Sequence, residues 1–281
     1  MEQGVCTIHA KLSAVGITDV GSVRTLNEDS IAVEAELGLL VVADGMGGHD
    51  AGEVASKMVI NTLISYLQEE EEDATIVMPA SANPLPASAN PLDEEEEEIT
   101  LKSLPDPNLA RMREAVHYAN QQLSQLNRSR GYDEGTGMGS TVVGYWQAEA
   151  GVPGVVFHVG DSRLYLFRDG DLRQITRDHS MYEQWKAFGS NGQPPAKNIL
   201  TQAMGPVSQI SPDILSLVLQ PHDVMLLCSD GLSGMVSDQV IADLLFDVTQ
   251  ENLAEQGKQL IELAKLGGGK DNVSIVLAVA H

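Results

Sequence analysis

Two amphipathic helices are predicted by apolar residues that recur every three or four positions. The first follows a glycine-rich loop, and its apolar residues are Val54, Met58, Val59, Leu63, Tyr66 and Leu67. The second begins at Asp106-Pro107, a capping residue followed by proline in the first helical position. Its apolar residues are Leu109, Met112, Val116, Leu123 and Leu126. Because the apolar residues of each helix fall on one side, we expect both helices to cover a core.

Short β-branched or apolar runs dominate the remaining sequence and predict strands. They occupy residues 39–43, 140–146, 155–159, 164–167, 172–176, 214–219, 224–228 and 273–279. Asp169-Gly170 predicts a hairpin turn, and two further helices are expected near 239–246 and over 253–266. Strands follow one another in runs instead of alternating with helices, so the pattern predicts an α+β fold of antiparallel sheets covered by helices.

Residues 69–99 interrupt this pattern. Two acidic runs, at 69–73 and 93–98, flank a segment in which residues 79–85 are repeated as 86–92. Repelling charges and a Pro/Asn/Ser-rich repeat cannot form a core, so we predict a disordered insertion. The insertion is either a solvated loop or a docking site for a basic partner. Because a β-rich domain reaches about 250 residues, we expect the rest of residues 1–281 to form a single domain.

A formal net charge of −23 argues against binding to nucleic acid or to an anionic membrane surface. Cys6 and Cys228 are far apart and lack metal-ligand spacing, which predicts two buried structural thiols in a reduced compartment. No basic segment followed by an apolar run opens the sequence, and no run approaches the roughly 18 apolar residues of a membrane span. We therefore expect a cytoplasmic protein.

Aspartates recur where predicted strands end. Asp44, Asp161 and Asp230 each follow an apolar run, and Asp271 comes just before the last one. Each alone is compatible with an ordinary turn. If the strands converge at one end of a sandwich, however, these carboxylates meet and need a compensating cation. Oxygen ligands without cysteine favour Mg²⁺ or Mn²⁺, with Ca²⁺ as an open alternative.

Residues 18–29 add Arg24 to this acidic set, together with Glu28 and Asp29. A guanidinium beside a hard-metal site suits phosphate binding, whereas the alternative is an ordinary surface ion pair. The loop 45–48 matches neither common glycine-rich phosphate-binding pattern. We expect its glycines to let the backbone approach the metals and to free a carbonyl as a ligand.

Seven segments resemble, in order, the motifs of the PPM-type (protein phosphatase 2C) Ser/Thr phosphatases in their compact bacterial form. They are Thr18-Asp19-x-Gly21-x-x-Arg24-x-x-Asn27-Glu28-Asp29, Val42-Ala-Asp44-Gly-Met-Gly-Gly-His49, Met138-Gly-Ser-Thr141, His158-Val-Gly-Asp161-Ser-Arg163, Asp178-His-Ser180, Cys228-Ser-Asp230-Gly-Leu232 and Gly268-Gly-Lys-Asp271-Asn-Val273. They span about residues 14–280, apart from the acidic insertion. The resemblance implies a four-layer αββα sandwich of two antiparallel sheets flanked by helices.

The resemblance also implies two Mn²⁺ or Mg²⁺ ions at one end of the sandwich. Asp44 would bridge both ions, Asp230 and Asp271 would bind one, and the Gly45 carbonyl would bind the other. A water or hydroxide bridging the ions would attack phosphorus directly, so no phosphoenzyme forms.

Further residues take roles by the same resemblance. Glu28 matches a ligand position, acting directly or through water, and Asp29 would lie behind the ligands. Asp161 would join Asp230 at a weaker third metal. Arg24 would bind the phosphate. His49 has a possible role at the substrate or leaving group, against the alternative of an ordinary loop histidine.

The segment 181–204 corresponds to the flap beside the active site of this family. Many bacterial relatives carry His-Pro-x-Arg-Asn there, whereas this sequence reads Gln193-Pro-Pro-Ala-Lys197-Asn198. The difference concerns substrate preference and leaves the metal ligands intact. His179 is expected to be structural.

The leading hypothesis is a cytoplasmic, monomeric protein phosphatase that acts on phosphoserine and phosphothreonine, on substrates of a Ser/Thr kinase. One alternative is a catalytically silent binding module on the same fold. Such a module should have lost metal ligands, whereas Asp44, Asp230 and Asp271 are all present in this sequence. The other alternative is a metal phosphohydrolase that acts on small molecules.

Overall fold

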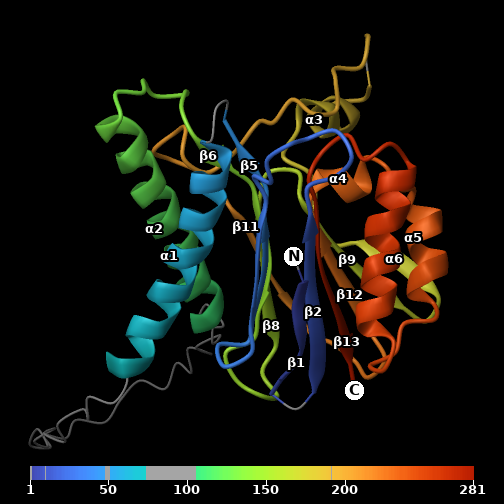
Figure 1. The fold of residues 1–281 in the computed structure, drawn as a ribbon. Helices are drawn as coiled ribbons and strands as arrows, with labels where there is room; N and C mark the ends of the chain where they lie inside the picture. The colour runs from blue at the N-terminus through green and yellow to red at the C-terminus, as the bar shows by residue number, and fades with distance from the viewer. Residues whose placement is uncertain (1, 10, 48–50, 74–105, 191) are drawn as a thin grey trace, which may run out of the picture.

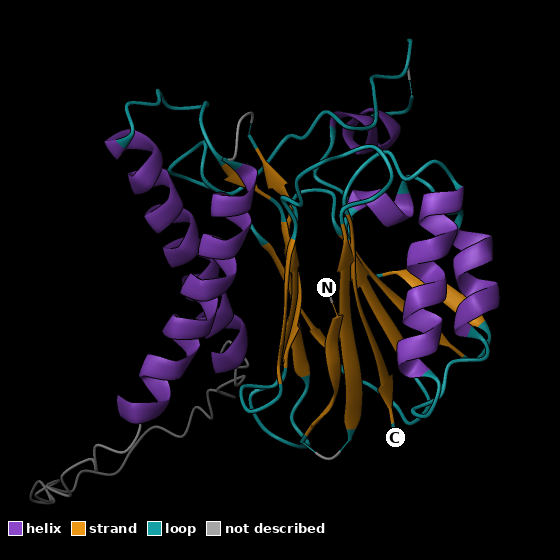
Figure 2. Cartoon of the chain, viewed as in Figure 1, coloured by secondary structure: helices purple, strands orange, loops and turns teal. Residues whose placement is uncertain are grey.

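Two antiparallel β-sheets lie face to face, and helices cover the outer side of each in the computed structural model (Figures 1 and 2). The structure describes residues 2–9, 11–47, 51–73, 106–190 and 192–281. The arrangement confirms the predicted α+β class and the four-layer sandwich. Within the described ranges, no helix is both long and apolar enough to cross a membrane.

The first sheet has six strands in the order β1-β2-β13-β12-β9-β10, each antiparallel to its neighbours. Their bounds are β1 (Glu2–Ile8), β2 (Leu12–Asp19), β13 (Val273–Ala280), β12 (Val224–Cys228), β9 (Arg163–Arg168) and β10 (Asp171–Gln174). Asp169 and Gly170 both have positive φ and join β9 to β10, as the predicted hairpin requires. Every residue of the central strands β12 and β13 is buried.

The second sheet has five antiparallel strands in the order β11-β8-β7-β4-β3. Their bounds are β11 (Asp213–Leu217), β8 (Gly154–Val159), β7 (Val142–Trp146), β4 (Leu39–Ala43) and β3 (Ser30–Glu34). A short pair, β5 (Gly45–Met46) and β6 (Gly139–Ser140), forms a third sheet at one end. Alternate residues of β4 face opposite sides: Leu40 and Val42 pack between the sheets, whereas Leu39 and Val41 pack against helices.

Helices α1 (Gly52–Asp73) and α2 (Pro107–Ser129) cover the five-stranded sheet, and α4 (Asp230–Ser233), α5 (Asp238–Leu245) and α6 (Leu253–Leu266) cover the other (Figure 1). The short helix α3 (Met181–Ala187) lies at one end of the sandwich. The Asp106 side chain accepts a hydrogen bond from the Asn108 amide, and Pro107 opens α2, which confirms the predicted helix start. The predicted apolar stripes of α1 and α2 pack in one cluster against the sheet.

Some predicted boundaries differ from the structure. Helix α1 continues through Asp73, so the first acidic run belongs to this helix. The rest of the predicted insertion lies mostly outside the described residues, and the single-domain assignment stays a prediction. Cys228 is buried as expected, whereas Cys6 is only partly buried.

Candidate metal centre

Four aspartates come together at one end of the sandwich, where β5, β6, α3 and α4 also lie (Figure 1). Asp44 follows β4, Asp161 comes two residues after β8, Asp230 opens α4 after β12, and Asp271 precedes β13. Strands β4, β8 and β12 run toward this end, and β13 runs away from it. The alternating directions of the strands therefore bring the four predicted carboxylates together.

The backbone of Asp44 is fixed by the motif that carries Thr141. The Asp44 amide donates to the Thr141 hydroxyl at 3.1 Å, and the Asp44 carbonyl accepts from the Thr141 amide at 2.8 Å. The Ser140 hydroxyl also donates to this carbonyl, at 3.1 Å. The Thr141 hydroxyl lies 2.7 Å from the hydroxyl of Ser162, next to Asp161. Thr141 therefore links the two loops that present Asp44 and Asp161.

Asp29 is buried beside the cluster, with only 6% of the residue exposed. It accepts a hydrogen bond from the Ser229 hydroxyl at 2.9 Å, and the Ser229 hydroxyl in turn accepts from the Ser274 amide at 3.0 Å. Burial raises the pKa of Asp29 to about 7, although hydrogen bonds with Ser274 and Ser229 lower it. Asp29 thereby holds the residue that immediately precedes Asp230.

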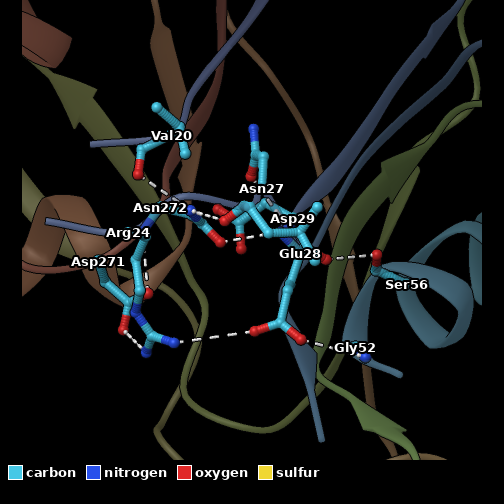
Figure 3. Close-up of polar contacts among 10 residues, drawn as sticks. Val20, Arg24, Asn27, Glu28, Asp29, Gly52, Ser56, Asp271 and Asn272 are labelled. Atoms are coloured by element: carbon cyan, nitrogen blue, oxygen red, sulfur yellow. Dashed lines mark hydrogen bonds and ion pairs between the residues drawn. The ribbon is translucent and has the colours of Figure 1, made fainter. Parts of the chain in front are cut away.

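The side chain of Asn272 joins the loop of Asp271 to the N-terminal loop (Figure 3). Its amide nitrogen donates to the carbonyls of Val20 and Leu26, at 3.0 and 2.9 Å. Its carbonyl oxygen accepts from the Glu28 amide at 2.8 Å. Asn272 is 3% exposed, so these three hydrogen bonds satisfy a buried polar group. They fix the position of Glu28 relative to Asp271 across more than 240 residues of sequence.

Arg24 lies between Asp271 and Glu28 (Figure 3), with 47% of its side chain exposed. One of its terminal nitrogens donates to Asp271 at 2.8 Å, and the other lies 3.8 Å from a carboxylate oxygen of Glu28. Glu28 also accepts a hydrogen bond from the Gly52 amide at 3.2 Å, at the start of α1. The structure therefore places the predicted phosphate-binding cation beside two predicted metal ligands.

Only glycine fits at position 45. A Cβ atom there would lie 2.1 Å from the Gly52 carbonyl oxygen and 2.5 Å from that of Glu28. This close approach brings the backbone next to Asp44 against the start of α1. The predicted approach of this backbone to the metals stays a prediction.

The electrostatics of the cluster favour a bound cation. Burial raises the pKa of Asp44 well above its usual value, and the charges of Asp29, Asp230, Asp161 and Asp271 raise it further. The pKa of Asp230 is raised mainly by burial and next by the charge of Asp271. The pKa of Asp161 is raised to about 7, mainly by burial and next by the charge of Asp230. Carboxylates with mutual repulsion and no sulfur ligand fit hard divalent cations such as Mn²⁺ and Mg²⁺. The donor set therefore fits the two ions predicted from the sequence.

One predicted site residue is not described by the structure, and one feature of the site was not predicted. His49 lies outside the described residues, so its role stays a prediction. The hydrogen bonds of Asn272 were not predicted, because its partners are backbone atoms of a loop at the other end of the sequence. The one local signal is an amide residue between Asp271 and the eight buried residues of β13.

Asn272→Ala should weaken Mn²⁺ binding by roughly 10- to 100-fold, as supporting residues around metal ligands typically do. The Glu28 amide would lose its acceptor, and the loop that carries Arg24 would be released from Asp271. Isothermal titration calorimetry with Mn²⁺ measures this effect. Asn108→Ala, in the first turn of α2, is the matched control and should bind like the parent protein. Equal Mn²⁺ affinity in both variants would show that Asn272 does not support the site.

Comparisons with known proteins agree with this geometry. The family described as Protein phosphatase 2C matches residues 22–265. The serine/threonine phosphatase stp of Listeria monocytogenes is 33% identical over 268 residues, 92% of each chain.

Solved structures give the same answer. The serine/threonine phosphatase PstP/Ppp of Mycobacterium tuberculosis has a TM-score of 0.75 and 32% identity, covering 96% of this chain and 98% of its own. PppA of Pseudomonas aeruginosa has a TM-score of 0.74 and 29% identity, covering 99% of both chains. A further PstP structure, described as a complex with two manganese ions, has a TM-score of 0.71 and 32% identity, covering 96% of this chain and 98% of its own. With its carboxylate cluster and its sequence matched to one family over most of its length, this chain belongs to the protein phosphatase 2C family.

Proposed function

We propose that this chain is a metal-dependent protein phosphatase that hydrolyses phosphoserine and phosphothreonine in proteins. The observation that carries the proposal is the buried carboxylate cluster around Asp44 with Arg24 at its rim. The curated relatives are named serine/threonine phosphatases. A catalytically silent module is disfavoured, because Asp44, Asp230 and Asp271 are all present. Three hydrogen bonds from the Ser140–Thr141 segment hold the backbone of Asp44.

The carboxylates would hold two ions, Mn²⁺ or Mg²⁺. Asp44 would contact both, Asp230 and Asp271 one, and the Gly45 carbonyl the other. Glu28 would act directly or through water, and its hydrogen bond from the Gly52 amide favours a fixed orientation. The PstP complex with two manganese ions supports this stoichiometry. When bound, such ions supply an activated water nucleophile and neutralise charge on the phosphoryl oxygens.

The residues of the chain contribute binding and orientation. A guanidinium has five N–H donors, so Arg24 can keep its hydrogen bond to Asp271 and still bind a phosphoryl oxygen. Asp161 and Asp230 repel each other and would share a weaker third ion. We assign His49 a role at the substrate or leaving group. The flap around α3 exposes Met181, Phe188 and Ile199, which gives it apolar contacts for a protein substrate.

We further propose that the substrates are products of a Ser/Thr kinase and that the enzyme acts as a monomer in the cytoplasm. Both cysteines are free thiols, which supports a reduced compartment.

Asp230→Asn should lower kcat/KM for a phosphothreonine peptide by at least about 100-fold, because it removes a charged ligand. Mn²⁺-dependent release of phosphate measures the reaction. Asp247→Asn, an exposed aspartate after α5, should retain the parent rate. Equal activity in the two variants, or activity that survives a chelator, would contradict the proposed function. A higher kcat/KM on phosphometabolites than on phosphopeptides would favour the small-molecule alternative.

Arg24→Ala should lower kcat/KM by roughly 10- to 100-fold, the loss expected for one charge-assisted hydrogen bond. Steady-state kinetics on the same peptide check this, with Mn²⁺ affinity measured in parallel to separate phosphate binding from metal binding. Arg173→Ala is the matched control, because the side chain of this arginine is 71% exposed. Its salt bridge within the described residues is to Asp171, away from the carboxylate cluster. An unchanged kcat/KM for Arg24→Ala would remove Arg24 from the phosphate site.

A further inference from the structure

Two histidines and an aspartate form a second cluster of ligand atoms beside the flap. His158 lies on β8, and Asp213 lies directly opposite it on β11. His179 comes from the loop that leads into α3. One nitrogen of each histidine and one carboxylate oxygen of Asp213 all lie within 4.8 Å of one another. None of these three side chains belongs to the carboxylate cluster around Asp44.

His158 is buried without the partners that an imidazole normally has. Its side chain is 0% exposed, and neither ring nitrogen has a hydrogen bond of ordinary geometry in the part of the chain that the structure describes; the backbone of Gly160 is the polar group that approaches the ring. The carbonyl of Gly160, close to this ring, accepts the His179 amide at 2.7 Å. Burial, followed by the neighbouring His179, lowers the pKa of His158 to about 4. An imidazole binds a metal ion in its neutral form, through the free lone pair of one nitrogen.

His179 and Asp213 have the spacing of two ligands of one ion. Nε2 of His179 lies 3.4 Å from a carboxylate oxygen of Asp213. This distance exceeds the usual 2.7–3.2 Å of an N–H···O hydrogen bond. It matches the separation of about 3.3–3.4 Å between two tetrahedral ligands whose bonds to zinc are about 2.0–2.1 Å. The His158 and His179 rings lie with their centroids 4.5 Å apart, so the third ligand is close by.

The cluster is open to solvent on one side. Asp213 is 57% exposed and His179 is 11% exposed, whereas His158 lies at the buried end. Asp213 and His179 line a surface pocket of about 490 Å³ together with Glu183 and Gln202. An ion can therefore reach the three side chains from solvent, and a water molecule can complete its coordination.

We propose that His158, His179 and Asp213 bind one divalent transition-metal ion of the zinc type, separate from the ions of the carboxylate cluster. Two imidazoles and one carboxylate suit zinc, whereas Mg²⁺ and Ca²⁺ prefer oxygen ligands alone.

Coordination changes one hydrogen bond of His179. Nδ1 of this ring accepts from the Gly160 amide at 3.2 Å, which leaves Nε2 facing Asp213. Metal binding through Nε2 places a ring proton on Nδ1, and the Gly160 amide loses its acceptor. One neutral hydrogen bond contributes much less than metal coordination, so the exchange favours the bound state.

A bound ion would fix the base of the flap. The ligands come from β8, from β11 and from the residue before Ser180, whose hydroxyl accepts the Glu183 amide and caps α3. His158 is also three residues before Asp161 on the same strand and loop. The site would therefore stabilise the join between the flap and the carboxylate cluster. This inference does not depend on the proposed phosphatase activity.

Zinc binding to the intact protein tests the proposal. The carboxylate cluster is first saturated with excess Mg²⁺, and bound zinc is then counted by equilibrium dialysis and elemental analysis. Asp213→Asn should bind one equivalent less than the matched control Asp171→Asn, a similarly exposed aspartate on β10. Zinc that enters the carboxylate cluster adds equally to both variants and cancels in the difference. With Co²⁺ as the probe, the intense visible absorption of a tetrahedral site should be present only in the control.

A second variant and a second measurement distinguish loss of the zinc site from misfolding. Zinc should raise the melting temperature of Asp171→Asn by more than that of Asp213→Asn, and His158→Gln should behave like Asp213→Asn. Equal zinc stoichiometry and equal Co²⁺ absorption in all three variants would overturn the proposal. The cluster would then be a pair of buried histidines hydrated by water.

Discussion

Mutual repulsion among carboxylates at one end of the sandwich is the constraint on which the site depends. Burial and neighbouring negative charges raise the pKa of Asp44, Asp161 and Asp230 together. Such a cluster is destabilising unless cations offset it, because the desolvation of each charge adds to the repulsion. The side chain of Arg24 lies at the rim, where it pairs with Asp271. Divalent ions are the remaining means of holding the cluster ionised.

The fold opposes this repulsion with hydrogen bonds that hold the loops around the carboxylates. Thr141 fixes Asp44, Ser229 connects Asp29 to the strand before Asp230, and Asn272 connects the two loops at the rim. Each of these residues lies next to a strand of one of the two large sheets. The positions of the carboxylates are therefore set by strand pairing deep in the sandwich.

Much of the fold and the cluster of carboxylates could be predicted, because their signals are local. A buried apolar run followed by Asp marks Asp44 and Asp230, and capping residues mark the start of α2. Other features depend on distant parts of the chain. Strand β2 was not predicted, because it is buried along nearly all of its length and lacks polar alternation. Helix α3 was not predicted either, because it has only seven residues and none of them is buried. The pairing of His158 with Asp213 follows only from the register of β8 and β11.

The central claim is that the carboxylate cluster holds two metal ions. A crystal of the intact protein grown with Mn²⁺ and measured at an energy sensitive to manganese locates these ions directly by anomalous scattering. The account predicts two strong peaks, with Asp44 between them, Asp230 and Asp271 on one, and the Gly45 carbonyl on the other. A single peak, or no manganese beside Asp44, would contradict it.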